Sequence, residues 1–551
     1  MTITDSPPAT GTAPAVSSPA VAGLYEALTT TDHKRIGRLW LRSGMLLLVG
    51  TVVLGVLVGI ERVDGESTDL FGGDNAFFQM WALYRVGLAL LVVAPLFVGL
   101  ATIVVPMQVG STNIAFPRAA AAAVWGFLIG AVIMIAAVMA NGGWGAVDRA
   151  SGDERDAVAL TLVGMGMVVV SLLLGALCIA TTVVSLRVKG MTLLRTPLFA
   201  WSMLVTAGVW LLTLPVLLAN LLIAYVDLHN GPGTFGGGLS GDLSIYAQIE
   251  WVFEQPQVYA FAIPVLGVLG SIVPVAAGVR AARHGLSMGL IGLFGLLSVG
   301  AWAQPFFQPT NDALVRYDEK FVYIGFGIAA ILPVLGAIGG AADTLFRGRG
   351  NLAGLPPAHL IGALGAGLVL AAGTLAGIAR VIEPFELGQR VTVTGVMNLV
   401  LLAAVAAAVA GIWFWGPKVC GHELSPAIGR LVLTLLLVGG LVVGAAQVVN
   451  GFLETSVSPL VAPTEDAGDA LNAVALVGLV IVALGAVGAL ATLLTAMRTG
   501  GAGDADDPWG GHTLEWSTAT PPPAGNFAEP PALVTSEAPL LDASTDEGEE
   551  S

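Results

Sequence analysis

Residues 86–105 read VGLALLVVAPLFVGLATIVV, an unbroken run of 20 residues without a charged side chain. The run does not alternate between apolar and polar residues, so it predicts a helix and not a strand of a membrane barrel. A helix of this length is about 30 Å long, which is the thickness of the hydrocarbon core of a bilayer. The stretch therefore predicts a transmembrane helix.

Similar apolar runs recur along the whole chain. The predicted spans are 40–60, 81–105, 119–140, 158–186, 197–226, 251–279, 286–307, 321–342, 358–379, 391–415, 426–448 and 470–497. The composition agrees, with 55% hydrophobic and 11% charged residues and a mean hydropathy of +0.83. Soluble domains carry about a quarter charged residues. The predicted fold is all-α, a polytopic membrane protein of twelve transmembrane helices.

The two ends of the chain differ from this predicted membrane domain. Residues 1–23 and 499–551 are rich in Pro, Ala, Ser and Thr, and the second segment carries much of the net charge of −15. Such composition is typical of disorder. We therefore expect a disordered tail at 1–23, a twelve-span domain at 24–498 and an acidic, Pro-rich tail at 499–551. The first long apolar run starts near Trp40, which argues against a signal peptide.

Charge in the loops predicts the orientation. An even number of spans puts both termini on one side, and that side carries 15 of the 23 Lys and Arg residues. Loops rich in Lys and Arg stay in the cytoplasm. Both termini are predicted to be cytoplasmic, in the inner (plasma) membrane of the cell.

Several function classes receive no support from the sequence. It has no basic patch or nucleic-acid motif, so we expect no nucleic-acid partner. Cys178 and Cys420 are too few for a disulfide framework and lack metal-site spacing, and both are predicted to be inert.

Five strings at helix ends carry a resemblance to a known family. They are TTDHKRIG at 30–37, VPMQVG leading into AFPR at 105–118, WVFEQPQVY at 251–259, WGPK at 415–418, and DPWGGHTLEW followed by PPP at 507–523. In order and spacing the chain resembles cytochrome c oxidase subunit I, of the haem-copper oxidase superfamily. The resemblance covers residues 24–530.

The resemblance implies a low-spin haem, and a second haem facing a copper ion, all held by histidines within the spans. The positions that match those six ligands are Tyr84, Gln255, Gln304, Pro305, Gly395 and Met397. None of the six is a histidine, and the six histidines of the chain fall in loops, in tails or at the mouth of a span. We therefore expect a divergent member of the family without haem, copper or any other metal.

The proton routes and the redox tyrosine are altered in the same way. Gln257 stands where the family has a membrane-embedded glutamate, Asn113 at the acid of a proton-path mouth and Ala337 near a proton-path lysine. Glu454 follows span eleven, where the family carries an arginine pair facing the haem propionates. Tyr259 matches a redox-active tyrosine, and we expect its hydroxyl to bind a neighbouring polar group.

Two charged residues, Arg85 and Glu254, lie at the outer ends of predicted spans. Long charged side chains commonly reach from such positions to the membrane surface. We expect both to do so, and the alternative is that they line an outward-facing cavity.

Three functions stay open on the sequence. The first is a non-catalytic scaffold or regulatory subunit that has lost haem and copper binding and proton pumping, with subunit II- or III-like proteins and the lipid bilayer as partners. The second is a residual redox enzyme in which Tyr84 and Met397 ligate a haem. The third is a transport or lipid-binding protein that uses the vacated cavities. Although the family reduces oxygen and translocates protons, we expect no active oxidase and a degenerate active site.

Overall fold

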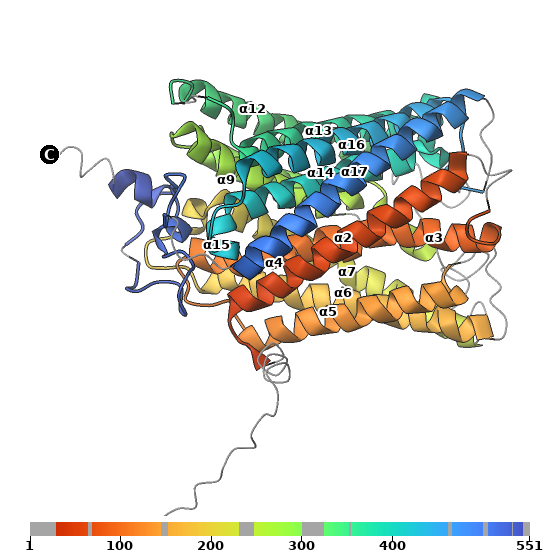
Figure 1. Cartoon of the computed structure of the whole chain (residues 1–551), viewed down its shortest axis with the longest axis horizontal. Helices are drawn as coiled ribbons and strands as arrows, with labels where there is room; N and C mark the ends of the chain where they lie inside the picture. Colours follow the sequence, from red (N-terminus) through yellow and green to blue (C-terminus); the bar gives the residue numbers. More distant parts are fainter. Residues whose placement is uncertain are drawn as a thin grey trace, which may run out of the picture.

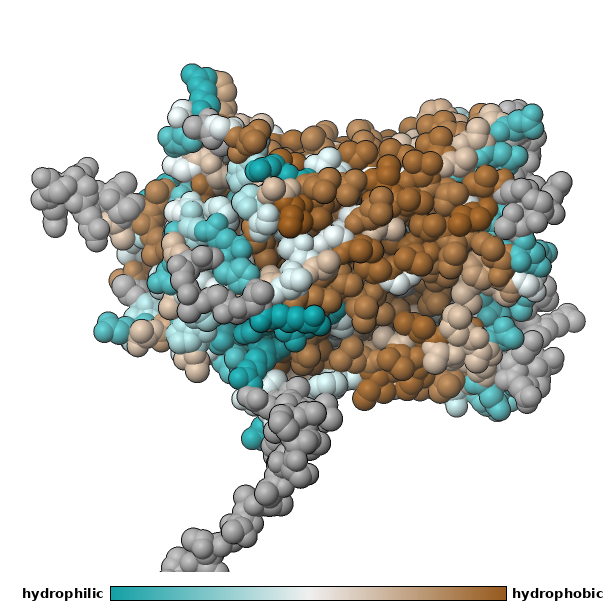
Figure 2. Space-filling view, viewed as in Figure 1, coloured by the Kyte–Doolittle hydropathy of each residue, from teal (hydrophilic) through white to brown (hydrophobic). Residues whose placement is uncertain are grey.

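The structure is a computed structural model that describes residues 29–63, 69–144, 153–230, 247–299, 324–351, 354–460, 466–499, 505–531 and 533–543. Within these residues the chain is a bundle of long helices lying roughly side by side (Figure 1). On the face shown in Figure 2, an apolar band covers the middle of the bundle, and hydrophilic residues gather at its two ends. This distribution confirms the all-helical membrane fold.

The described part of the chain contains 11 helices long and apolar enough to cross a membrane. They are α2 (His33–Val63), α3 with η1 and α4 (Asp74–Val86, Gly87–Val93 and Ala94–Gln108), α5 (Pro117–Ala137) with η2 (Val138–Gly142), α6 (Asp153–Ser185), α7 (Leu198–Asn230), α9 (Ile263–Ala277) with η5 (Gln257–Phe261), α12 (Ile331–Arg347), α13 (Ala358–Val381), α14 (Thr392–Phe414), α16 (Pro426–Phe452) and α17 (Asp466–Thr499). The twelfth predicted span, 286–307, falls on the shorter α10 (His284–Ser298), and residues 300–307 lie outside the described residues. The eighth predicted span, 321–342, is described from residue 324 onward, and the other ten predicted spans lie wholly within the described residues.

The sixth predicted span, 251–279, differs from a continuous helix. It consists of two 3₁₀ turns, η4 (Trp251–Phe253) and η5, followed by α9. Pro256 lies between the two turns, and Pro264 lies in the first turn of α9. Because proline has no N–H to donate, it interrupts the hydrogen bonds of a helix, which hydropathy alone does not reveal.

Two spans form the centre of the bundle. The most apolar stretches of α14 and of the span built from α3, η1 and α4 are entirely buried by protein, whereas those of α2, α5 and α17 are less than half buried. Pro95 lies at the start of α4, and the span is π-helical from Gly87 to Val93 just before it. A proline that removes one helical hydrogen bond is a common cause of such local rewinding.

Glycines let the helices approach closely. A Cβ added to Gly439 on α16 would lie 2.8 Å from the carbonyl oxygen of Gly478 on α17, and one added to Gly478 would lie 2.8 Å from the Val443 nitrogen. Small residues at such crossings are the usual means of helix packing inside a membrane.

The start of α2, the end of α17 and residues 505–543 all lie at one end of the bundle, called here the terminal side (Figure 1). Residues 505–543 form the 3₁₀ turn η9 (Leu514–Ser517) and pack against helix ends. The prediction of disorder is therefore wrong for this part of 499–551. Residues 1–28 and 544–551 lie outside the described residues.

Candidate functional site

Tyr84 begins a chain of hydrogen bonds that joins three helices. Its hydroxyl, on α3, donates to Oδ1 of Asn398 on α14 at 2.8 Å. Nδ2 of Asn398 donates in turn to Oε1 of Gln447 on α16 at 2.8 Å. A Cβ added to Gly55 on α2 would lie 2.6 Å from the Tyr84 ring, so a fourth helix closes the site. Tyr84 is thus held as a buried, hydrogen-bonded phenol.

Gly395 and Met397 lie on the same buried helix, α14. Met397 is fully buried in the hydrophobic core. A Cβ added to Gly395 would lie 2.8 Å from the Val448 nitrogen and 3.0 Å from the Gly444 oxygen, both in the backbone of α16. At Gly395, α14 and α16 are therefore in backbone contact, and no larger side chain fits without movement.

Gln255 and Tyr259 form a second buried cluster with α13. Nε2 of Gln255 donates to the carbonyl oxygen of Gly377 at 2.7 Å, and the Tyr259 hydroxyl donates to Oε1 of Gln255 at 3.4 Å. A Cβ added to Gly377 would lie 2.3 Å from the Tyr259 oxygen, so this glycine makes the contact possible. The prediction that the Tyr259 hydroxyl binds a polar neighbour is confirmed.

The remaining predicted positions are less informative. Gln257 is buried beside this cluster, in η5. Gln304 and Pro305 lie outside the described residues. Ala337 is in α12 and makes a wall of a small hollow between α9, α10 and α12.

Neither Arg85 nor Glu254 reaches the surface in the way the sequence suggested. Glu254 forms an ion pair and hydrogen bond with Arg380 of α13, and the two side chains are 15% and 3% exposed. Arg85 is fully buried, with its guanidinium carbon 4.7 Å from the centroid of the Trp81 ring. The prediction fails because an ion pair and a cation–π contact give these charges favourable surroundings within the protein. Glu454 is different, since it lies near Arg390 in an exposed position.

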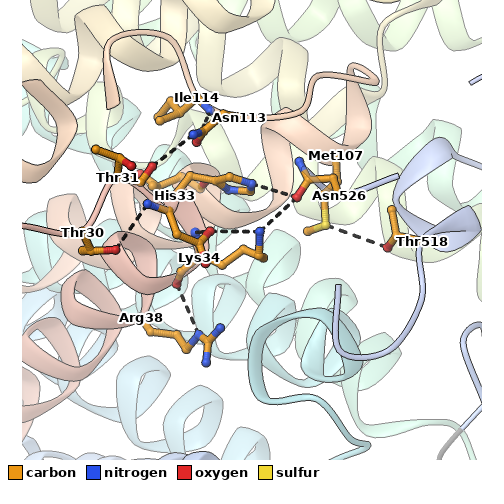
Figure 3. A network of polar contacts seen from close by, with 12 residues as sticks. Thr30, Thr31, His33, Lys34, Arg38, Met107, Asn113, Ile114, Thr518 and Asn526 are labelled. Carbon is orange, nitrogen blue, oxygen red and sulfur yellow. Dashed lines mark hydrogen bonds and ion pairs between the residues drawn. The ribbon is translucent and has the colours of Figure 1, made fainter. Parts of the chain in front are cut away.

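Asn113 belongs to a polar network on the terminal side (Figure 3). Its Nδ2 donates to the carbonyl oxygen of Thr31 at 3.0 Å, and its Oδ1 accepts from the Ile114 amide at 2.9 Å. The Nδ2 bond joins the segment just before α2 to the loop between α4 and α5, and the Oδ1 bond lies within that loop.

Asn526, which sequence reasoning missed, is the centre of the same network. Its Oδ1 lies 2.9 Å from Nε2 of His33 and 3.3 Å from Nζ of Lys34, and its Nδ2 donates to the Ser111 carbonyl oxygen at 2.8 Å. Asn526 is fully buried although it belongs to the segment predicted to be disordered. The motif at 507–523 was the available signal, because it marked this tail as more than low-complexity sequence.

Two charged residues anchor that segment to the bundle. Oε1 of Glu515 accepts from Gln108 Nε2 at 2.9 Å and from Trp415 Nε1 at 3.2 Å, and burial raises the pKa of the Glu515 carboxyl. Nζ of Lys418 donates to the Asp506 carbonyl oxygen at 2.9 Å, and burial lowers the pKa of Lys418 to about 8. We call residues 505–543 the terminal cap, because they cover the ends of several helices.

Comparison with known proteins identifies the family. Residues 35–487 match the family model of Cytochrome C and Quinol oxidase polypeptide I. A putative cytochrome c oxidase subunit 1-beta of Streptomyces avermitilis is 29% identical over 536 residues, covering 94% of this chain and 92% of the relative. Cytochrome c oxidase subunit 1 of Corynebacterium diphtheriae is 27% identical over 539 residues, covering 94% and 92%.

These comparisons overturn the expectation that the chain takes no haem and no copper. The matching family is that of the cytochrome and quinol oxidases, and the relatives are named as cytochrome c oxidase subunits. The prediction was wrong because it equated a replaced histidine with a lost cofactor. Haem iron is also bound by thioether and phenolate groups in other proteins, so a replaced ligand does not by itself remove a haem.

The described residues fit the two cofactors unequally. The Tyr84 phenol and the Met397 thioether are donor types that haem iron accepts. Gln255 does not fit a histidine-type copper site, because both ends of its amide are already hydrogen-bonded. Among the residues that the structure describes, no group of three or more His, Cys, Asp or Glu is arranged to hold a metal ion.

The fold agrees with the family. A solved haem-copper terminal oxidase dimer superimposes with a TM-score of 0.68 at 15% sequence identity, covering 84% of each chain. At this identity the likeness concerns the fold alone. Together with the match over residues 35–487, it leads to one conclusion: the chain belongs to the Cytochrome C and Quinol oxidase polypeptide I family, the subunit I family of the haem-copper oxidases.

Proposed function

We propose that this chain is a scaffold or regulatory subunit of a membrane oxidase assembly, and that oxygen is reduced at another subunit. The proposal concerns the role of the chain and not its cofactor content. The observation that carries it is the cluster of Gln255, Tyr259 and Gly377, in which the copper-site positions are closed by hydrogen bonds to one another and to the backbone of α13.

Neutral side chains on the proton routes support the same role. Asn113 and Gln257 replace acids of the family, and an amide does not release a proton in the physiological pH range. Asn113 is also held at both ends by backbone groups. A chain with these side chains does not pump protons along those two routes.

The proposed partners are subunit II- or III-like membrane proteins. The terminal cap and the long apolar helices keep an ordered framework on which other subunits can assemble. The excess of Lys and Arg in the loops of the terminal side supports a cytoplasmic location for both termini, and we propose the plasma membrane as the site of the bundle.

A redox role with unusual ligands is the second candidate, and one contact favours it. Tyr84 donates its hydrogen bond to Asn398, which is the residue directly after Met397 on α14. The Tyr84 hydroxyl on α3 is therefore hydrogen-bonded to the turn of α14 that carries Met397. A haem between them would leave electron transfer as a function of this chain.

The deciding experiment uses the tagged full-length chain, purified in mild detergent with its partners. We expect Gln255→Leu and Tyr259→Phe to leave both the subunit composition and the oxygen uptake of the assembly unchanged. A fall in oxygen uptake with the assembly intact would overturn the scaffold role. Deletion of the chain should cause the other subunits to dissociate. If they stay associated and active without it, the proposal is contradicted.

Haem content separates the two candidates. A pyridine haemochrome assay on wild type, Tyr84→Phe and Met397→Leu measures haem per chain. Stoichiometric haem that is lost in both variants, with a changed reduced-minus-oxidised spectrum, would establish the redox role. Tyr225→Phe, at a half-exposed tyrosine on α7, is the matched control.

A further inference from the structure

A groove of about 500 Å³ opens on the outside of the bundle between α5, α6 and α7. Its floor is one face of α6, with Val163, Met167, Val170 and Leu174 at successive turns. Val163 and Val170 are 44% and 48% exposed, so the floor faces the surroundings of the bundle and not its core.

Small residues produce the hollow. Ala122 and Gly126 lie one turn apart on α5, and Gly166 lies on the floor. A Cβ added to Gly166 would have one neighbour, a methyl carbon of Leu218 at 3.6 Å. Longer side chains at these positions would fill the space that α5 and α7 leave above α6.

The lining indicates an apolar occupant. Apart from Ser171 and Tyr225, every lining side chain is apolar. The groove lies along the membrane-spanning parts of all three helices, where hydrocarbon is the surrounding medium. A polar ligand would lose its hydrogen bonds there without replacement.

Size distinguishes a lipid chain from a protein helix. From Leu162 to Leu174 the floor is about 18 Å long at 1.5 Å per residue, which is more than half of the roughly 30 Å hydrocarbon core. A transmembrane helix about 10 Å wide and 30 Å long occupies on the order of 2,400 Å³. The groove therefore has room for one extended hydrocarbon chain and is too small to enclose a helix.

One end of the groove carries amphipathic side chains. Tyr225 is near the end of α7 and is 36% exposed, and its ring lies 4.4 Å from the ring of His229. Nδ1 of His229 is 2.8 Å from the Tyr225 carbonyl oxygen, which fixes the pair. Rings of this kind gather where hydrocarbon meets lipid headgroups.

We propose that the groove between α5, α6 and α7 binds one acyl chain of a membrane lipid, with the headgroup at Tyr225 and His229, in the leaflet away from the terminal side. The site is separate from the positions around Tyr84 and Gln255. It therefore stands whether or not the scaffold role is correct.

The test counts lipid on the purified full-length chain. After extensive detergent washing, native mass spectrometry and lipid extraction should find about one retained phospholipid per chain in wild type. Gly166→Leu should remove it, because the new side chain fills the floor. Gly208→Leu is the matched control on α7, where an added Cβ has nothing within 4 Å, and it should keep the lipid.

A second variant and a crosslinking experiment distinguish loss of the lipid site from misfolding of Gly166→Leu. Val170→Phe narrows the same floor from an exposed position and should also lose the lipid while keeping the wild-type elution profile. A phospholipid with a photoreactive acyl chain should label peptides of α6. Wild-type protein without retained lipid, equal retention in Gly166→Leu, or crosslinks from the floor to another subunit in place of lipid would each overturn the proposal.

Discussion

The Nε2 atom of His33 lies 2.9 Å from Oδ1 of Asn526, although 493 residues separate the two in the sequence. His33 is the first residue of α2, and Asn526 belongs to the terminal cap. The contact joins α2 to a segment that follows α17, and it makes the terminal cap part of the folded domain.

Asn526→Ala should lower the free energy of unfolding by about 1–3 kcal/mol, because His33 and Lys34 would lose a buried acceptor. Thermal unfolding of the purified protein in detergent, followed by tryptophan fluorescence, measures the change. Asn230→Ala, at an exposed position at the end of α7, serves as the control. Equal midpoints for the two variants would show that the cap contributes little to stability.

Gly395→Ala should destabilise the bundle by about 1–3 kcal/mol, since its new methyl group would meet the backbone of α16 at 2.8 Å. Gly208→Ala adds the same methyl group to a helix face with open space and should gain up to about 1 kcal/mol from helix propensity. Unfolding midpoints of the two variants are compared in the same detergent. Two equal midpoints would contradict the backbone contact between α14 and α16.

Glu254→Gln and Arg380→Gln should each destabilise the protein by about 3 kcal/mol, because each removes the opposite charge of an ion pair that is largely buried. The double variant should cost less than the sum of the two single variants. This double-mutant cycle measures the coupling directly. Additive effects would show that the two charges are solvated separately.

The packing of the terminal cap against the bundle should become less stable as the pH rises. Burial raises the pKa of Glu515 above its ordinary value of 4.5, so its stabilising contribution is complete below about pH 4.5 and is lost as the pH rises through the raised value. Hydrogen exchange or limited proteolysis of residues 505–543 at several pH values reports the loss. Glu515→Gln should flatten the profile, whereas the exposed Glu529→Gln should keep it. An unchanged slope in Glu515→Gln would assign the pH dependence to other groups.

The sequence predicted the membrane spans, which depend on the length of each apolar run. It did not predict contacts between side chains that are far apart in the sequence. The helix quoted from residues 86–105 and ten other spans follow from hydropathy, because each span is apolar over its own length. The ion pair of Glu254 and Arg380 joins residues 126 positions apart, and hydropathy contains no information about such contacts. In the sequence, the only sign of the breaks in the sixth span was the pair of prolines, Pro256 and Pro264.

The candidate site was predicted in part. The sequence predicted a polar neighbour for the Tyr259 hydroxyl, and the structure identifies that neighbour as Gln255. The partner of Tyr84, Asn398, was not foreseen, because it lies 314 residues away in the sequence. The cofactor prediction failed for a different reason, since it was drawn from single positions while the match to the family extends over residues 35–487.

The position of Asn526 near the end of the chain has a consequence for biosynthesis. The segment of α2 is synthesised long before Asn526, so the contacts of His33 and Lys34 with Asn526 form only after α17 has been translated. A product that stops early, for instance at a nonsense codon directly after α17, would keep the described spans and lack the contact of His33 and Lys34 with Asn526. The contact therefore forms only in chains that have been translated through Asn526.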